Sequence, residues 1–372
     1  MRCWLEAGSK TRSSEITRKY PAVSAVSNLR DQLENMVART RVTLPRSVFE
    51  RAQTAIKELH EFAHSPQWLG ELRNRLISRR QIEVFETAAP ESSVLTSFDF
   101  HYDFKTDLLS LIEINTNASM FLLTAEISEG EPGTRALESL HDSFVHEWGE
   151  NIPGRVAIID DTPPAQRAYF EFLMFADLFR SWGVQTVDIY DTADLPVEEI
   201  LQQHGFIYNR STDFYLELQK SAQLWTAWHE NQLKMSPHPR EYLLLADKQR
   251  LIDFSEKQIS PVLIPARHIS SYTDPDKLWE QRKNLFFKPR ALFGGKAVYR
   301  GASISTKVFR EIMTKDYIVQ EYRPAGEWME QKFDLRFFVY KSDIQLVCAR
   351  IYTGQVTNFS NPGGGIAAIQ FY

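Results

Sequence analysis

The chain has 372 residues, 43% of them apolar and 24% charged, a composition ordinary for a globular protein of roughly two to three domains. Its formal charge of −5 argues against a general nucleic-acid binder, and its two cysteines, Cys3 and Cys348, support neither a disulfide framework nor a cysteine metal site. No apolar run approaches the roughly 20 residues that span a bilayer. The first residues lack the apolar stretch of a signal peptide, so we expect a cytoplasmic protein without membrane or nucleic-acid partners.

Residues 1–94 are expected to form an N-terminal helical region. Between Ala22 and about Ile77, apolar side chains recur at steps of three and four residues, which is typical of a packed helical face. Pro45 is expected to separate two helices, and Pro66 to begin another break. The apolar series that carries this prediction is Leu29, Leu33, Val37, Phe49, Ala52, Ile56, Leu59, Phe62 and Ala63.

Residues 95–150 differ in character, because "LSLIEINTNAS" indicates an apolar strand that ends in a polar turn. Glu113 and Asn115 are two positions apart on this strand, so their side chains project from the same face. A carboxylate and an amide oxygen on one face are ligands that magnesium accepts. Such pairs are also common on solvated strands, and the pair alone leaves both interpretations open.

Residues 151–235 contain a predicted βαβ unit. The stretch "GRVAIIDDTPPAQRAYFEFLMFADLFRSWGVQTVDIYD" indicates a strand, a turn, a long helix and a second strand, with Gly183 where the helix would end. "GFIYNR" is expected to form a further short strand, and the residues from Phe214 to His229 an amphipathic helix. We expect this segment to form an α/β domain.

Residues 236–372 begin with a helix from about Ala246 and continue into "LFFKPRALFGGKAVYRG". Leu285–Phe287 is a predicted strand end, and Gly294 and Gly295 permit close backbone approaches between Lys288 and Lys296. Such a loop can face phosphate oxygens with amides and ammonium groups. It is not a Walker A loop, because the required first glycine and the Ser or Thr are missing. A plain Gly-Gly turn with solvated lysines is the alternative.

The last hundred or so residues are rich in predicted strands, "YIVQEY", "DLRFFVY" and "IQLVCARIY", with antiparallel pairs near the C-terminus. The whole pattern predicts an α/β or α+β fold. Asp334 and Arg336 share a strand face and either contact a ligand or belong to a structural ion-pair network. The glycines at 363–365 either approach a ligand closely or form a flexible turn.

In their order along the chain, these motifs resemble the eukaryotic-type glutathione synthetases, a circularly permuted branch of the ATP-grasp ligases. The resemblance runs from about Phe98 to the C-terminus. It rests on "IEINTNAS", "VAIIDDTPPAQRAYFEF", "IYNRSTDFY", "LLLADKQRLIDF", "FKPRALFGGKAVYRG", "YIVQEYRP" and "GGGIAA". It implies a permuted ATP-grasp fold with N-terminal helices and an inserted βαβ substrate-domain unit. Residues 95–150 would join the ATP-grasp core, 151–235 would bind substrate, and 236–372 would bind nucleotide.

The resemblance also implies roles for individual residues. The nucleotide ligands would be Lys248, Lys288, Gly294, Gly295, Lys296, Gln320, Glu321, Tyr322, Arg323 and Glu327. Magnesium would be held by Glu113, Asn115 and Asp334, while Arg336 and Arg350 would be catalytic. The substrate would contact Asn117, Ser119, Asp161, Gln166, Arg210, Ser211, Gly364, Gly365, Ile366 and Ala367.

The implied activity is that of an ADP-forming carbon–nitrogen ligase that uses ATP and Mg²⁺ to join a carboxylate and an amine through an acyl phosphate. The chain departs from the family at Leu292, where a metal-binding glutamate is expected, and at Gln355-Val356-Thr357, where an Arg-x-Lys element is expected. Asp334 would replace the metal-binding glutamate, and Arg350 is a displaced candidate for the role of the Arg-x-Lys element. These departures predict a different acid and amine from those of glutathione synthetase. The alternatives are a nucleotide-binding regulatory or degenerate module, a phosphotransferase of the same fold, and an unrelated α/β protein. A homodimer is one candidate assembly.

Overall fold

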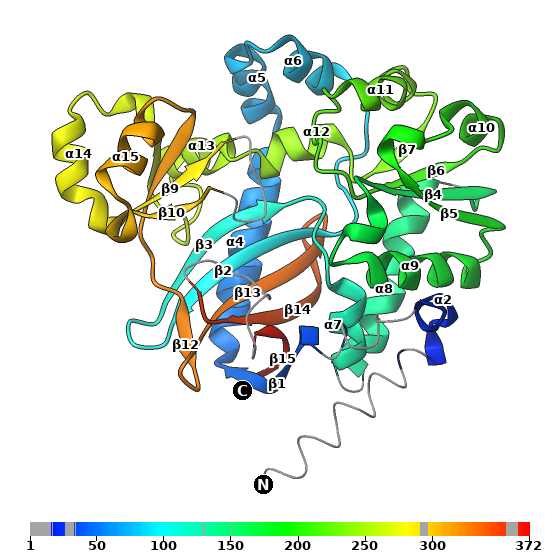
Figure 1. Cartoon of the computed structure of the whole chain (residues 1–372), viewed down its shortest axis with the longest axis horizontal. Helices are drawn as coiled ribbons and strands as arrows, with labels where there is room; N and C mark the ends of the chain where they lie inside the picture. Colours follow the sequence, from blue (N-terminus) through cyan, green and yellow to red (C-terminus); the bar gives the residue numbers. More distant parts are fainter. Residues whose placement is uncertain are drawn as a thin grey trace, which may run out of the picture.

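The structure, a computed structural model, describes residues 16, 18–26, 33, 35–128, 131–149, 151–290, 297–354 and 364–372. Within them, three β-sheets and the helices that cover them form a mixed α/β architecture (Figure 1). The main sheet lies at the centre of the molecule, and each of the two smaller sheets lies to one side of it in this view. The predicted α/β class is confirmed.

The main sheet joins early and late parts of the chain. Its order is β1-β15-β14-β13-β2-β3, with β12 paired to β13. The β1–β15 pair is parallel and the other pairs are antiparallel, which confirms the predicted antiparallel C-terminal pairs. Strand β2 pairs with β13, so residues near 100 lie beside residues near 336. The strands are β1 (Val37–Leu44), β2 (Thr96–Asp103), β3 (Leu108–Asn115), β12 (Gly326–Trp328), β13 (Gln331–Tyr340), β14 (Asp343–Tyr352) and β15 (Gly365–Phe371).

The helical prediction around Val37 is wrong, because residues 37–44 form strand β1. Its sequence, "VARTRVTL", is rich in the β-branched residues that favour strands, and β15 offers a partner edge. The helix predicted after Pro45 is confirmed as α4 (Arg46–Ala63). Pro66 starts a helix instead of a break, since α5 (Pro66–Arg75) has proline at its first position and Ser65 as its N-cap. Helix α6 (Arg79–Glu86) follows.

Two apolar cores cover the two faces of the main sheet. On one face, α4 and α5 pack on side chains such as Phe337 and Leu335. On the other face, α7 (Phe121–Ile127), α8 (Glu131–Trp148) and α9 (Tyr169–Ser181) pack around Phe338 and Leu346. The short helix α2 (Pro21–Ser24) contributes Val23 to this second core. None of the helices in the described ranges is long and apolar enough to span a membrane.

The second sheet is parallel and has the order β5-β4-β6-β7. The predicted βαβ unit is confirmed as β4, α9 and β5, and Gly183 follows the helix with a φ of +95°. The helix predicted from Phe214 starts only at Ala222, because the Asp213 carboxylate accepts the backbone N–H groups of Glu217 and Leu218 and holds a turn there. The elements are β4 (Arg155–Asp160), β5 (Thr186–Asp191), α10 (Val197–Gln202), β6 (Phe206–Asn209), α11 (Ala222–His229) and β7 (Lys234–Ser236).

The third sheet has the order β10-β9-β11-β8 and is antiparallel. One face packs on α14 and α15 through Phe287 and Phe309, and the other contacts α13 through Ile318 and Ile252. The elements are α12 (Pro239–Glu241), the π-helical turn η4 (Tyr242–Ala246), α13 (Gln249–Lys257), β8 (Ala266–His268), α14 (Pro275–Gln281), β9 (Leu285–Pro289), β10 (Tyr299–Arg300), α15 (Thr306–Met313) and β11 (Tyr317–Glu321).

Candidate active site

Lys288 lies on β9, where alternation places its side chain opposite Phe287 and so toward the main sheet. The side chain is buried, and its ammonium nitrogen donates a hydrogen bond to the backbone carbonyl oxygen of Ile112 at 2.9 Å. Burial lowers the pKa of Lys288 to about 8, and the nearby ammonium of Lys248 lowers it as well. The Glu113 carboxylate acts in the opposite direction. A strand of the third sheet thus brings a buried cation to the Glu-x-Asn strand.

Lys248 reaches the same place from the start of α13. Burial lowers its pKa, and the carboxylates of Glu113 and Asp247 partly oppose that effect. A small pocket of about 30 Å³ is lined by Lys248 together with Glu113 and Asn115. Glu113 and Lys248 are more than a hundred positions apart and line the same pocket, and the buried ammonium of Lys288 lies beside the same strand.

The Asn115 side chain is oriented by two carboxylates. Its amide nitrogen donates to Asp99 Oδ2 at 3.1 Å and lies 3.4 Å from Glu113 Oε1. Its carbonyl oxygen consequently points away from both carboxylates. The oxygens of Glu113 and Asn115 are hard ligands of the kind that Mg²⁺ prefers, and the residues present fit such an ion.

Asp99 lies opposite Glu113 on the neighbouring strand β2 and is fully buried. Arg336 stands opposite it on β13 and binds it with two nitrogens, Nε to Oδ1 at 2.8 Å and Nη2 to Oδ2 at 2.6 Å. Arg350 Nη2 adds a third contact to Asp99 at 2.9 Å. Burial raises the pKa of Asp99, but attraction to the two guanidinium groups outweighs it, so the pKa is lowered overall.

Arg350 also binds Asp334, with Nε 2.5 Å from Oδ1, and both are buried. The structure therefore shows the ion-pair network that the sequence left as one alternative for Asp334 and Arg336. Burial lowers the pKa of Arg350, but the attraction of Asp334 and Asp99 raises it overall. The metal role of Asp334 and the catalytic roles of the two arginines stay predictions.

The predicted adenine strand is β11 with the residues that follow it. Gln320 is buried, and its Nε2 has no hydrogen-bond partner among the described residues. Tyr322 stacks on Phe286, with ring centroids 6.0 Å apart, and the Arg300 guanidinium lies 4.3 Å from the Tyr322 ring. The backbone oxygen of Arg323 accepts a hydrogen bond from the partly buried His101 at 3.0 Å. Glu321 and Glu327 are exposed on β11 and β12.

The predicted substrate residues form two sets of contacts at the ends of the neighbouring strands β6 and β4. Asn117 Nδ2 lies 3.4 Å from the backbone oxygens of both Arg210 and Ser211, and Arg210 Nη1 donates to the Ala118 oxygen at 3.0 Å. Arg210 is buried, and its Nε has no partner in the described part of the chain.

The second group lies at the end of β4. The Asp161 carboxylate pairs with Lys220 at 2.5 Å, and its backbone oxygen accepts the Gln166 amide at 2.6 Å. Asp161 and Gln166 therefore belong to a local cluster in the parallel sheet. Ser119 contributes its backbone oxygen to Arg336 Nη1 at 3.4 Å, which ties the Glu-x-Asn turn to β13.

The C-terminal glycine motif is part of the main sheet. Gly365 has a φ of +149°, and a Cβ there would lie 2.6 Å from the Met36 backbone oxygen, so the close approach is to the chain's own β1 segment. Gly364 is buried, and Ile366 and Ala367 have no exposed surface. Leu292, Gly294, Gly295 and Lys296 lie outside the described residues.

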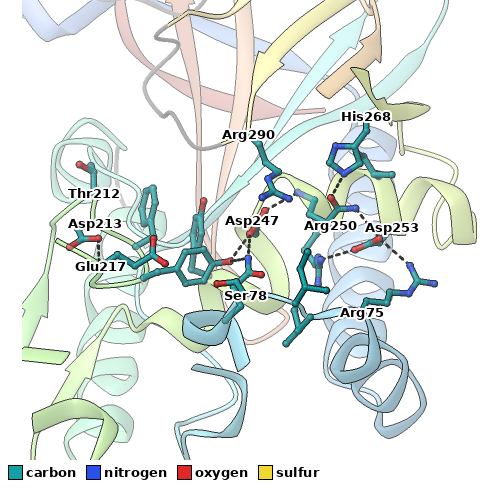
Figure 2. A pocket seen from close by; sticks show the side chains of 18 of the residues that line it. Arg75, Ser78, Thr212, Asp213, Glu217, Asp247, Arg250, Asp253, His268 and Arg290 are labelled. Carbon is teal, nitrogen blue, oxygen red and sulfur yellow. Dashed lines mark hydrogen bonds and ion pairs between the residues drawn. The ribbon is translucent and has the colours of Figure 1, made fainter. Parts of the chain in front are cut away.

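A cavity of about 780 Å³ lies next to this centre (Figure 2). It shares Phe214 and Tyr242, whose rings stack 4.2 Å apart, with the pocket of Glu113. Its wall carries Arg250, whose Nη2 pairs with Asp253 at 2.8 Å, while its Nε and Nη1 are buried without partners among the described residues. Figure 2 shows Arg75, Arg250 and Asp253 on one side and Asp247 near the middle.

No protein-family model and no curated protein sequence matches this chain. Among solved structures, a glutathione synthetase-like effector from Globodera pallida, in its apo form, matches over 97% of this chain and 96% of its own, with a TM-score of 0.53 and 10% identity. The chain has a glutathione synthetase-like fold. Two other structures match at lower TM-scores. A putative gamma-glutamylcysteine synthetase from Methylobacillus flagellatus has 0.46, with 9% identity over 85% of this chain and 86% of its own. The ATP-grasp ligase PsnB, complexed with minimal precursor, Mg and ADP, has 0.32, with 13% identity over 59% and 89%.

The glutathione synthetase-like fold confirms the resemblance stated from the motifs at the level of architecture. The circular permutation and the inserted unit stay predictions. Within this fold, sequence reasoning missed Asp99 and the large cavity. A single carboxylate inside the apolar strand "TSFDFHYD" was the available signal for Asp99, because a buried carboxylate needs a cationic partner. The cavity had no comparable signal, since its wall combines residues 75–81, 212–217 and 242–290.

Proposed function

We propose that this protein is an ATP- and Mg²⁺-dependent ligase that joins a carboxylate to an amine and releases ADP and phosphate. One observation carries the proposal: Lys288 and Lys248, from the late part of the chain, converge on Glu113 from its early part. Two cations beside a carboxylate and an amide oxygen suit a triphosphate with its metal ion. The glutathione synthetase-like fold supports the same conclusion.

In the proposed reaction, an oxygen of the substrate carboxylate attacks the γ-phosphorus of ATP, and the bond to the β-γ bridging oxygen breaks to release ADP. The amine then attacks the acyl carbon, and inorganic phosphate leaves as the amide forms. Lys288 and Lys248 would hold the phosphate oxygens and balance their negative charge in a site with little water. Mg²⁺, held by Glu113 and Asn115, would supply further charge neutralisation.

A buried lysine suits phosphate binding because nearby charges decide whether it is in its ammonium form or its neutral form. Burial lowers the pKa of Lys288 to about 8, so the ammonium form is disfavoured although the Glu113 and Asp99 carboxylates attract it. A bound polyphosphate would add negative charge and favour the ammonium. The lysine therefore gains more from the nucleotide than an already solvated lysine would.

The large cavity is the proposed site of the acid or amine. Its wall carries both signs of charge, with Arg75 and Arg250 near Asp253, and Asp247 near Arg290 (Figure 2). The Nε and Nη1 atoms of Arg250, which have no partner among the described residues, favour a ligand with a carboxylate or phosphate, and the acidic residues favour one with an amine. A small zwitterion, such as an amino acid or a short peptide, combines both features.

The ion pairs of Arg336 and Arg350 favour a second candidate function. Arg336 and Arg350 are engaged by buried carboxylates, so neither guanidinium is free to contact a substrate as it stands. A degenerate nucleotide-binding module, or a phosphotransferase of the same fold, would need fewer substrate contacts than a ligase.

The deciding experiment measures ADP and phosphate release from MgATP with pools of carboxylic acids, with and without amines. Hydroxylamine, which traps acyl phosphates as hydroxamates, replaces the amine in a parallel series. A ligase gives ADP, phosphate and hydroxamate only when an acid is present. ADP without free phosphate indicates a phosphotransferase, and nucleotide binding without turnover across the pools supports the degenerate module.

The division into segments 1–94, 95–150, 151–235 and 236–372 is proposed on the same basis as the function. A cytoplasmic location and a homodimeric assembly are proposed as well.

A further inference from the structure

A cluster of two histidines and one glutamate joins helix α4 to helix α12, apart from the nucleotide pocket. His60 lies in the last turn of α4, His64 lies just beyond its end, and Glu241 ends α12. One ligand atom from each residue lies within 4.8 Å of the other two. The two imidazole rings are one helical turn apart, with centroids separated by 4.3 Å. Such spacing lets both rings point at the same place.

Both ring nitrogens of His64 face oxygen atoms that accept hydrogen bonds, but a neutral imidazole carries a proton on only one of them. Its Nδ1 lies 2.9 Å from the His60 backbone oxygen, which can only accept, so Nδ1 carries the proton. Its Nε2 lies 3.0 Å from Glu241 Oε2, which as a carboxylate also only accepts. Positive charge is required between these two atoms, from a second proton on the ring or from a metal ion.

His60 supplies the observation that separates these possibilities. Its Nε2 is buried and has no hydrogen-bond partner within the described residues. The backbone of Glu91 also interacts with this ring, and we assign that contact to Nδ1 because Nε2 has no partner among the described residues; Nε2 then keeps a lone pair. A second proton on His64 would satisfy Glu241 but would leave this lone pair unused. A metal ion would use all three atoms.

We propose that His60 Nε2, His64 Nε2 and Glu241 Oε2 bind a divalent transition metal of the Zn²⁺ class. Two imidazoles and one carboxylate form a donor set suited to zinc and poorly suited to magnesium. The 3.0 Å between His64 and Glu241 is close to the roughly 3.3 Å edge of a tetrahedron with zinc–ligand bonds of about 2.05 Å. The His60 oxygen that holds His64 Nδ1 is a typical outer partner of a metal-binding histidine.

The ion would tie the end of α4 to the segment that lines the cavities. Glu241 directly precedes Tyr242, whose ring borders both the large cavity and the pocket of Glu113. The Glu241 backbone is itself held by a hydrogen bond to His238 Nδ1 at 3.3 Å. The metal therefore has a structural role here, holding one wall of the site against the main sheet.

The test uses untagged full-length protein, stripped with a chelator and dialysed against ZnCl₂ in the presence of excess MgCl₂. We expect one equivalent of zinc per chain, a higher Tm with zinc, and an intense visible spectrum when Co²⁺ replaces it. His60→Gln should weaken zinc binding at least tenfold and remove the zinc-dependent rise in Tm. This variant should fold, because the His60 Nε2 atom makes no hydrogen bond in the described structure.

His141→Gln is the matched control, since His141 is a partly exposed histidine on α8 whose side chain is 40% accessible. It should bind zinc as the unaltered chain does. Equal zinc binding by the unaltered chain and by His60→Gln would overturn the proposal, as would loss of zinc on dialysis or displacement by magnesium. If His64→Gln or Glu241→Gln does not fold, the His60→Gln comparison still decides the matter.

Discussion

The ammonium nitrogen of Lys288 lies 2.9 Å from the backbone oxygen of Ile112, the residue directly before Glu113. This contact joins the third sheet to the main sheet and brings a late lysine to the early Glu-x-Asn strand. The meeting of these two motifs was predicted from their order along the chain. The structure confirms that they are adjacent.

Replacing Lys288 with methionine should weaken MgATP binding at least tenfold, because a phosphate contact is lost while the side-chain volume is kept. The free energy of unfolding should change by only about 1 kcal/mol, since one hydrogen bond to Ile112 is lost and one buried charge is removed. Calorimetric titration and thermal unfolding measure the two effects. Lys283→Met, at an exposed lysine before β9, is the control. Unchanged nucleotide affinity in Lys288→Met would remove this lysine from the site.

Nucleotide affinity should fall as the pH rises above about 8, the pKa of Lys288 in the free protein. Below that pH the lysine is an ammonium and attracts phosphate, and above it the lysine is neutral, so the loss is at most about tenfold per pH unit. Lys288→Arg should flatten this dependence, because arginine stays charged over the whole range. A dependence that is identical in the arginine variant would assign the effect to another group.

Glu113→Gln should raise the Mg²⁺ concentration needed for half-maximal nucleotide binding about tenfold or more, because one anionic ligand becomes neutral. The change leaves the shape of the side chain and its contact with Asn115 in place. A magnesium titration at fixed nucleotide concentration gives the measurement. Glu311→Gln, at an exposed position on α15, serves as the comparison. Full magnesium response in Glu113→Gln would exclude Glu113 as a ligand.

Asp334→Asn should lower the free energy of unfolding by roughly 3 kcal/mol, because Arg350 loses a buried charged partner. Denaturant unfolding measures this loss, and a magnesium titration of the folded variant measures the second role predicted for Asp334. A shift to higher Mg²⁺ concentrations would support it as a ligand. An unchanged magnesium response together with lower stability would restrict it to the ion-pair network.

Stability should fall as the pH rises from about 4.5 to about 8 because of Glu147, a buried residue on α8 whose pKa burial raises to about 8. In this interval the folded chain holds a proton on Glu147 that the unfolded chain has released, so each pH unit costs at most about 1.4 kcal/mol. Glu147→Gln should remove this slope, since glutamine keeps an acceptor for the Tyr340 hydroxyl, which donates to Glu147 at 2.9 Å. Glu138→Gln, exposed on the same helix, should keep it. Equal slopes in all three proteins would contradict the prediction.

Local patterns were enough for the elements whose own sequence decides their structure. The three-and-four spacing from Phe49 to Ala63 predicted α4, and the apolar run in "LSLIEIN" predicted β3 with Glu113 and Asn115 on one face. Gly183 was placed correctly as a helix end. These features depend on neighbours within one or two turns, which a sequence displays directly.

What the sequence determined by itself was thus the set of elements, the order of the motifs and the residue types available for phosphate and metal. Only the tertiary structure decided that residues 37–44 form a strand, because β15 supplies their partner from more than 300 positions away. It also decided that Arg336 and Arg350 bind Asp99 and Asp334, and that Lys288 is buried with a lowered pKa. Strand pairing, ion pairing and burial all depend on contacts between distant segments, and these form only when the chain folds.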